Sequence, residues 1–236
     1  VSIFIFKFVF MMDQKLLAYL EGYLTEKRKA LFKKVLEDRT RHFTVVLEDI
    51  FQPHNASAVV RTCDIFGIQD VHAIENKYNN KISRHVAKGS QKWLIYNRYR
   101  DDRDNTKSCL ASLKEKGYQI IATTPHNDSC LLQDFDVTKK SAFVFGVESE
   151  GVSETVIENA DGFLKIPMVG FTESLNISVA AAIILQEVTS KLRNSEVDWK
   201  LSNEEKQMLY FNWVKTTIKN VDKIEAYYHQ NLKNNE

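Results

Sequence analysis

The sequence predicts an α/β protein, and three features of the chain support this fold class. A β-rich run at residues 43–47, a helical pattern and a second β-rich run at residues 70–74 follow one another, as in a strand, helix, strand unit. Four of the eight glycines lie between residues 143 and 187, where strand-like hydrophobic runs stop. From Ile177 onward, apolar residues recur at helical spacing on most sides of a predicted helix, so we expect this helix to be buried.

The composition is that of a protein with one sizeable core. The chain has 236 residues, of which 44% are hydrophobic and 27% are charged, and this length allows one or two domains. We expect one core domain at residues 43–195, with helical extensions at residues 12–42 and 196–236. The formal net charge is +1, so the overall charge does not indicate a nucleic-acid partner, and any contact with RNA must be local.

Cysteine usage and hydropathy argue against several other classes. Cys63, Cys109 and Cys130 form no CxxC motif, and no histidine stands at ligand spacing near them, so we expect reduced thiols and no metal. The first ten residues are apolar, but Lys7 interrupts them and they are too short to span a bilayer. A start codon assigned too far upstream of Met11 explains them more simply than a signal peptide does. These features predict a cytoplasmic protein without a membrane segment.

Both ends of the chain show helical patterns. Apolar residues between positions 13 and 37 recur at helical spacing, with a break expected at Gly22. Beyond Trp199, apolar residues from Leu209 to Tyr228 fall on one face of a single predicted helix. The densest basic cluster of the chain lies near its amino terminus and comprises Lys27, Arg28, Lys29, Lys33, Lys34, Arg39 and Arg41. On its own, this cluster fits a solvated helix face and an RNA contact equally well.

After the first predicted strand, the sequence predicts a helix that carries an arginine outside its apolar face. Asn55 is expected to cap a helix that ends at Gly67, and Arg61 lies on a different face from the apolar stripe of that helix. An arginine there is either solvated or binds phosphate through its planar guanidinium group. The turn before Asn55 contains no GxGxxG motif, which argues against a nicotinamide dinucleotide site.

Basic and aromatic residues alternate between positions 79 and 103. This composition suits looped RNA, because cations hold phosphates while bases stack on aromatic rings. Arg84 and Lys88 belong to this segment. Residues 93–96 also fit a core strand, so a packing role explains their aromatic side chains equally well. A later predicted strand ends at Thr123, at the edge of the sheet where a ligand is expected.

The glycine-rich segment predicts a pocket that loops build at strand ends. A strand at residues 142–147 breaks at Gly146 and places Glu148 beyond the strand end, where open α/β sheets bind ligands. Ser174 and Asn176 precede the buried helix, and taken alone they are best explained as helix caps.

Three strings in these segments occur in a fixed order: NASAVVRTCDIFG from Asn55, GVESEG from Gly146 and IPMVGFTESLNISVA from Ile166. They resemble the three motifs of the SpoU/TrmH family of RNA ribose 2′-O-methyltransferases, within the SPOUT class. The resemblance covers roughly residues 43–195. Val147 is a departure, because the second motif of the family commonly carries asparagine at this position.

The resemblance implies a parallel sheet with helices on both faces, a carboxy-terminal trefoil knot and a homodimer. It implies S-adenosylmethionine as the cofactor, bound largely by backbone groups and without a metal. The cofactor-binding residues that it implies are Thr123, Gly146, Ile166, Leu175 and, nearby, Met168. The catalytic set that it implies is Asn55, Arg61, Glu148, Ser174 and Asn176, with the role of Arg61 open between general base and phosphate clamp.

The activity implied by the resemblance is methylation of a ribose 2′-hydroxyl in tRNA, at guanosine-18 of the D-loop, because the short helical extensions resemble those of the tRNA enzymes. A ribosomal RNA methyltransferase of the same family is the alternative, although only about forty residues precede the first strand, too few for a separate RNA-binding domain. An RNA-binding factor without turnover is disfavoured by the complete catalytic set. The residues expected to contact RNA are Lys27, Arg28, Lys29, Lys33, Lys34, Arg84 and Lys88.

Overall fold

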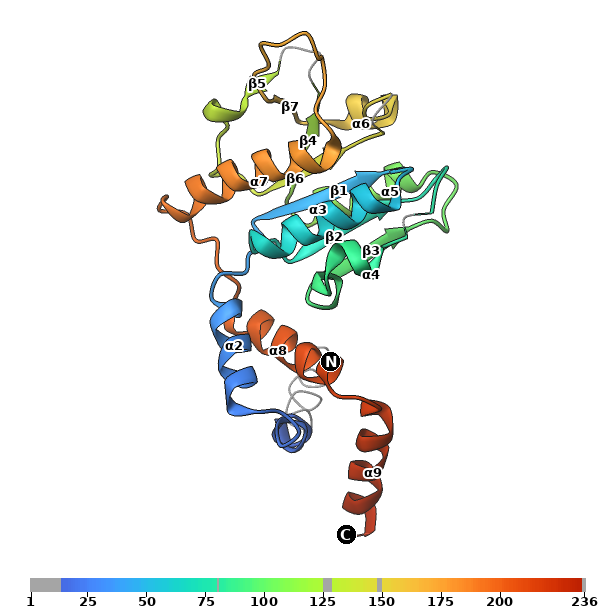
Figure 1. Cartoon of the computed structure of the whole chain (residues 1–236), viewed down its shortest axis with the longest axis vertical. Coiled ribbons are helices and arrows are strands. Elements are labelled where there is room, and N and C mark those ends of the chain that lie inside the picture. The colour runs from blue at the N-terminus through green and yellow to red at the C-terminus, as the bar shows by residue number, and fades with distance from the viewer. Residues whose placement is uncertain (1–13, 80, 125–128, 148–149, 235–236) are drawn as a thin grey trace. The chain divides into compact units, whose positions relative to one another are not determined.

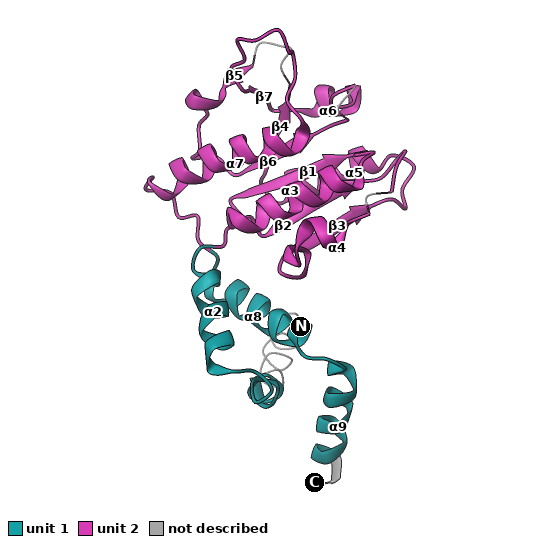
Figure 2. Cartoon of the chain, in the orientation of Figure 1, with its two compact units in different colours: residues 1–38, 201–236 teal, residues 39–200 magenta. Residues whose placement is uncertain are grey.

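The structure is a computed structural model that describes residues 14–79, 81–124, 129–147 and 150–234 (Figure 1). The chain divides into two compact units, one formed by residues 39–200 and the other by residues 1–38 together with 201–236 (Figure 2). The core domain expected at residues 43–195 lies within the larger unit. Segments from both ends of the chain therefore share one unit rather than forming two separate extensions.

A seven-stranded sheet forms the centre of the larger unit, in the order β3-β2-β1-β6-β4-β7-β5 (Figure 1). Each neighbouring pair of strands is parallel. The strands are β1 (Phe43–Glu48), β2 (Asp70–Ile74), β3 (Ile95–Tyr99), β4 (Gln119–Thr123), β5 (Cys130–Leu131), β6 (Ser141–Phe145) and β7 (Gly162–Lys165). This arrangement confirms the predicted α/β class.

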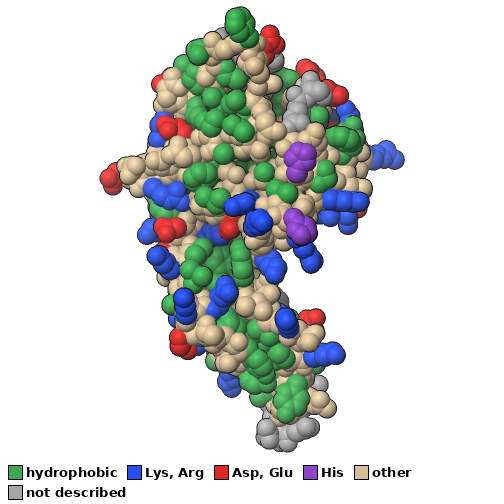
Figure 3. All heavy atoms as spheres, viewed as in Figure 1, with side chains coloured by type: hydrophobic (Ala, Val, Ile, Leu, Met, Phe, Trp, Pro, Cys, Tyr) green, Lys and Arg blue, Asp and Glu red, His purple; other side chains and the backbone are tan. Residues whose placement is uncertain are grey.

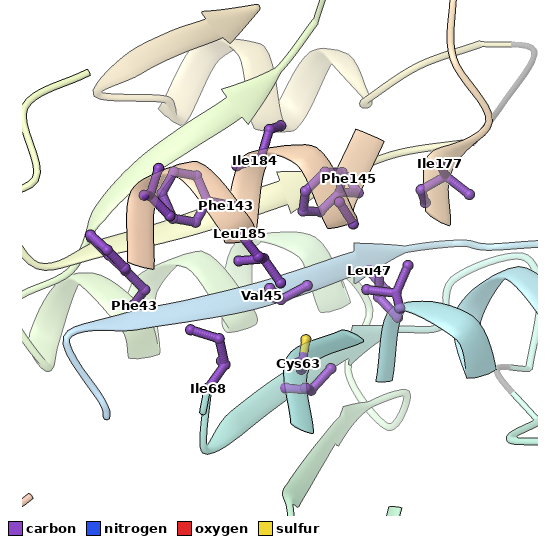
Figure 4. Packing of buried hydrophobic residues seen from close by; sticks show 14 of the residues in the cluster. Phe43, Val45, Leu47, Cys63, Ile68, Phe143, Phe145, Ile177, Ile184 and Leu185 are labelled. Carbon is purple, nitrogen blue, oxygen red and sulfur yellow. The ribbon is translucent and has the colours of Figure 1, made fainter. Parts of the chain in front are cut away.

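Helices cover both faces of the sheet. The helical segments of the larger unit are α3 (Pro53–Ile65), α4 (Arg84–Ala87), α5 (Asn105–Glu115), α6 (Glu154–Asn159) and α7 (Ile177–Arg193), with short 3-10 turns η1 (Ser90–Lys92) and η2 (Leu132–Asp134). Successive strand residues point to opposite faces, so β1 serves two cores. Val45 and Leu47 pack with α3 and α7 (Figure 4), whereas Val46 packs with α5 and α6.

The two cores supply most of the driving force for folding of the larger unit. Phe43, Phe143 and Leu185 are completely or almost completely buried in the cluster beneath α7 (Figure 4). Burial of each such side chain contributes about 1.5–3 kcal/mol relative to exposure. Because α7 is held by this cluster, the position of its first turn beside the carboxyl ends of the strands is fixed by packing.

Two predicted element boundaries in the larger unit need correction. Asn55 does not cap α3: the helix begins at Pro53 after the N-cap residue Gln52, and Asn55 lies buried in the first turn. Proline suits this place because it lacks the N–H group that a first helical residue leaves unpaired. The strand expected at residues 93–96 begins at Ile95, because Trp93 instead ends η1 and donates its N–H to the carbonyl of Ser90.

The smaller unit is helical. Residues 14–21 form a helix, and α2 (Glu26–Leu36) follows, so the break predicted at Gly22 is confirmed. The single helix predicted after Trp199 is wrong, because α8 (Asn203–Thr217) and α9 (Val221–Asn234) are separate helices. Asn220 interrupts the pattern with a φ of +55°, which a continuous right-handed helix does not allow.

An aromatic cluster joins the two chain ends within this unit. The Phe32 ring lies edge-on to Trp213, with 5.6 Å between centroids, and also contacts Tyr210. Lys206 forms an ion pair with Glu37 at 2.7 Å. The helices α2 and α8 are therefore one packed structure, although the residues of this ion pair are 169 positions apart in the sequence.

Arg39 and Arg41 have structural roles, which corrects their inclusion in the basic cluster near the amino terminus. Arg39 is buried and forms an ion pair with Asp64 of α3. Arg41 binds Asp70 of β2 at 2.7 Å. Both guanidinium groups hold the larger unit together, so neither is a candidate for RNA contact.

Candidate active site

A cavity of about 430 Å³ opens at the carboxyl ends of β4, β6 and β7. Loops that follow these strands, together with the first turns of α7, form its walls. All five residues expected to hold the cofactor line this one cavity: Thr123, Gly146, Ile166, Met168 and Leu175. The structure therefore places residues from three separate loops, which the sequence grouped as cofactor-binding candidates, at one cavity.

Gly146 makes the tight fold of the loop after β6 possible. A Cβ atom at this position would lie 2.0 Å from the carbonyl oxygen of Gly151, far closer than van der Waals contact allows. Val147 and Gly151 exchange backbone hydrogen bonds of 2.9 and 2.7 Å, which close the loop on itself. Glu148 lies outside the described residues, so its predicted place in the crevice stays a prediction.

The cavity is apolar at its base and carries few polar side chains. Phe145, Leu164 and Ile184 line it, and all three belong to the buried core. The hydroxyl of Thr123 donates to the carbonyl of Val144 at 2.8 Å, which ties that side chain to the sheet. A ligand here meets apolar side chains and backbone groups, together with three charged lining residues, Glu150, Lys165 and Glu173.

The first and third motifs meet through two asparagine side chains. Asn176 caps α7, as its Oδ1 accepts the N–H of Ser178 at 2.9 Å, so the simple capping interpretation is also correct. Its Nδ2 donates to Oδ1 of Asn55 at 3.2 Å, across 121 residues of sequence. Asn55 in turn donates to Oε1 of Gln52 at 3.1 Å. Ser174 lies in the exposed loop before α7 and lines the cavity.

Arg61 lies apart from the other described members of the expected catalytic set: Ser174 lines the cavity, and Asn55 and Asn176 contact each other without lining it. The Arg61 side chain is exposed on α3, and it forms no hydrogen bond or ion pair with any described residue. It does not line the cavity. Six residues after Asn55, it lies about 9 Å further along the helix axis and on another side of the helix. One chain alone does not bring Arg61 to the cavity.

Sequence reasoning missed Glu48, which positions the loop after β6. This glutamate ends β1 and is buried, and its carboxylate accepts hydrogen bonds from the hydroxyl of Thr106 at 2.8 Å and from Ser153 N and Oγ at 2.8 and 2.7 Å. It thereby anchors the start of α6, next to Gly151. A charged residue at the end of an otherwise apolar strand was the available signal.

The residues expected to contact RNA are mostly exposed. On α2, Lys27, Arg28, Lys33 and Lys34 face solvent, whereas Lys29 is half-buried and pairs with Glu26 at 2.5 Å. Arg84 and Lys88 are exposed at α4, in the other unit. Exposure permits contact with RNA, and the contact itself stays a prediction.

Metal and membrane features were searched in the described part of the chain. No three His, Cys, Asp or Glu side chains there are grouped so as to hold a metal ion. Among those same residues, no helix is both long enough and apolar enough to cross a membrane. Cys63 and Cys109 are buried free thiols, and burial raises the pKa of each above its ordinary value.

The parallel sheet, the loop-built cavity at its carboxyl edge and the Asn55–Asn176 contact together define an α/β protein of the SpoU/TrmH type. The chain belongs to the SpoU rRNA Methylase family, whose model matches residues 42–186.

Two curated relatives are named tRNA (guanosine(18)-2′-O)-methyltransferase. The one from Borreliella burgdorferi is 41% identical over 89% of this chain and 95% of its own length. The one from Thermus thermophilus is 40% identical over 69% of this chain and 82% of its own length.

Solved structures show the same fold. The A. aeolicus TrmH/SpoU tRNA modifying enzyme superimposes with a TM-score of 0.74 at 34% identity, covering 82% of this chain and 98% of that one. The SpoU methyltransferase AviRb from Streptomyces viridochromogenes, solved with AdoMet, gives a TM-score of 0.59 at 23% identity over 69% of this chain and 65% of its own, a likeness of fold alone.

Proposed function

We propose that this protein transfers a methyl group from S-adenosylmethionine to the ribose 2′-hydroxyl of guanosine-18 in tRNA. The observation that carries the proposal is the cavity, where residues of three distant loops converge beside the Asn55–Asn176 pair. Support for tRNA comes from relatives at 33–41% identity whose names specify guanosine-18 of tRNA. We also propose that it acts in the cytoplasm, as a tRNA-modifying enzyme of this family.

The cavity fits the cofactor chemically. S-adenosylmethionine supplies an activated methyl group on a positively charged sulfonium. The apolar base formed by Phe145, Leu164 and Ile184 suits a flat adenine ring. The carboxylates of Glu150 and Glu173 supply negative charge for the cationic end of the molecule. Backbone N–H and C=O groups at the strand and loop ends around the cavity offer hydrogen bonds to the adenine edge.

The protein must also align the ribose hydroxyl and accept its proton as the new C–O bond forms. No histidine among the described residues lines the cavity. His72 is buried against Tyr99, and burial lowers its pKa to about 4, so it stays neutral in the core of the fold. Arg61 remains the candidate, and its role is open between phosphate clamp and general base. A planar guanidinium cation is suited to bind an RNA phosphate beside the reacting ribose, whereas accepting the proton would require the side chain to lose its own proton first.

We propose that the enzyme is a homodimer. Apolar side chains are exposed on the loop before α7 and on one side of α7: Val169, Phe171, Leu175, Val179 and Ile183, called here the apolar face. Figure 3 shows hydrophobic side chains gathered over the part of the larger unit that carries β5, β7 and this loop. Exposed apolar patches of this kind mark protein interfaces. In the proposed dimer, a second copy covers the apolar face. Arg61, which is remote from the cavity of its own chain, then acts at the cavity of the other copy.

The trefoil knot implied by the family is also a proposal. It is supported by the chain path, since β6 inserts between β1 and β4, and β7 then lies between β4 and β5. The segment from β6 to α7 is the part that would pass through the knot. The proposed core domain at residues 43–195 contains this segment.

Ribosomal RNA is the second candidate substrate, because the matching family model describes rRNA methylases. Purified protein incubated with labelled S-adenosylmethionine and total cellular RNA separates the two. We expect label in the tRNA fraction, whereas label confined to ribosomal RNA would overturn the assignment to tRNA.

A further inference from the structure

Two exposed aromatic rings form a pair at the carboxyl edge of the sheet. Phe51 follows β1 and is 64% exposed, and Tyr78 follows β2 and is 40% exposed. Their ring centroids are 5.0 Å apart and their planes are inclined at 68°. Exposing two large rings together is unfavourable in water, so a binding role is the natural explanation.

Buried contacts hold this pair in place before any ligand arrives. Asp49 lies between β1 and Phe51, is 6% exposed and has a φ of +50°. Its backbone N–H donates to the carbonyl of Ile74 at 3.0 Å. Its carboxylate accepts the N–H groups of Lys77 at 2.7 Å and Tyr78 at 3.3 Å. One side chain therefore ties the two loops together, and the rings lose little further freedom on binding.

The pair adjoins the asparagine contact of the active site. Gln52, the residue after Phe51, accepts a hydrogen bond from Asn55, and Asn55 accepts one from Asn176, whose sequence neighbours Leu175 and Ile177 line the cavity. A ligand on the Phe51 ring is thus close in the RNA chain to a ribose that Asn55 and Asn176 help to orient.

The stretch of chain that carries Tyr78 is basic, although the buried Asp49 carboxylate lies beside it. Residues 77–88 contain Lys77, Lys81, Arg84 and Lys88 and no acidic residue. Lys77 lies 3.4 Å from Glu150, but both side chains are exposed, and such a pair offsets little of the local positive charge. Ser83 donates its N–H to Oγ of Ser57 at 2.8 Å, which holds this stretch against α3. Aromatic rings among cations are the combination that binds unpaired nucleotides, through base stacking and phosphate contacts.

We propose that Phe51 and Tyr78 form a stacking platform for an unpaired nucleobase of the substrate RNA, beside the ribose that is methylated. The proposal rests on the proposed function and adds a positioning element that none of the three motifs contains. An apolar peptide is a poorer occupant, because the basic stretch around Tyr78 favours a polyanion.

The test compares Phe51→Leu, which keeps an apolar side chain but removes the ring, with Phe51→Trp, which keeps a ring. Phe51→Leu is expected to bind unmodified tRNA transcript about tenfold more weakly. Its salt dependence should equal that of the wild type, because no charge is removed. Phe51→Trp should bind normally and show an additional fluorescence quench when tRNA is added. Ile65→Ala, at an exposed apolar position near the end of α3, is the matched control and should change neither property.

Three outcomes would overturn the platform. Wild-type affinity for tRNA in Phe51→Leu would show that the ring contributes nothing. Dissociation of the dimer by Phe51→Leu, measured by sedimentation, would assign the pair to a subunit contact. If the wild type methylates tRNA and the added fluorescence of the Phe51→Trp variant does not respond to tRNA, only the platform fails. If the wild type neither binds nor methylates tRNA, the proposed function fails with it.

Discussion

At the scale of single residues, Arg61 carries the sharpest expectation. Both Arg61→Lys and Arg61→Ala should lower kcat by on the order of 100-fold or more, because a flexible ammonium does not reproduce a planar group with several donors. Affinity for S-adenosylmethionine and thermal stability should stay at wild-type values, since Arg61 is exposed and does not line the cavity. Steady-state kinetics and calorimetry measure these quantities. Substantial turnover by Arg61→Lys would mean that positive charge alone is sufficient.

Gly146 offers a test of the cavity itself. Gly146→Ala places a Cβ atom 2.0 Å from the carbonyl oxygen of Gly151, so the loop must open, and cofactor affinity should fall at least about tenfold. Gly170→Ala is the matched control, because its nearest neighbour is 4.0 Å away. Calorimetry with S-adenosylmethionine in the presence of a chelator measures both variants. Equal affinities in the two variants would place the cofactor elsewhere.

At the scale of elements, α2 is expected to bind the tRNA backbone. Replacing Lys27, Arg28, Lys29, Lys33 and Lys34 with glutamine should weaken tRNA binding and flatten its dependence on salt, because fewer counterions are released. The modified nucleotide should remain the same, since phosphate contacts position a substrate without reading bases. Filter binding across a salt series measures the effect. Superimposable curves for the variant and the wild type would make α2 a merely solvated helix.

Elements with strong local signals could be predicted from the sequence. The strands β1 and β2 and the break at Gly22 follow from hydrophobic pattern and glycine placement, and all three are confirmed. Tertiary contacts decided the remainder. Asn55 has the side chain of a helix cap, yet it is buried to meet Asn176. Apolar residues keep their helical spacing from α8 into α9, so the sequence pattern does not indicate the break at Asn220.

The candidate site shows the same division. Motif strings identified Gly146, Ile166, Met168 and Leu175 of the cavity lining, because the spacing of these residues is carried by the sequence itself, and Thr123 was expected there from the end of a predicted strand. The network around Glu48 and the aromatic pair of Phe51 and Tyr78 could not be foreseen. Each joins segments that only the strand order brings together, and neither forms a recognisable string.

At the scale of the whole molecule, the separation of Arg61 from the cavity predicts a site shared between two copies. At a concentration of S-adenosylmethionine too low to occupy the weakened cavity of Gly146→Ala, Arg61→Ala and Gly146→Ala should each show little activity alone. A mixed dimer would have one complete site, formed by the intact cavity of one copy and the intact Arg61 of the other. Equimolar mixing after subunit exchange should restore about a quarter of wild-type activity, the statistical share of such sites.

The mixing experiment has a clear opposite outcome. If both functional groups act within one chain, no mixed dimer has a complete site and activity stays absent at every ratio. Val179→Glu, on the apolar face, provides the control, because a charge there should prevent dimer formation and abolish any rescue. Sedimentation verifies the state of each variant.

The identity of the methylated nucleotide tests the central claim most directly. Unmodified tRNA transcript is incubated with the protein and labelled S-adenosylmethionine, and the labelled nucleotide is then mapped. The account predicts label on the 2′-oxygen of guanosine-18 and none on a transcript that carries a 2′-deoxy ribose at that position. Label at another nucleotide, on a base, or in neither transcript would contradict it.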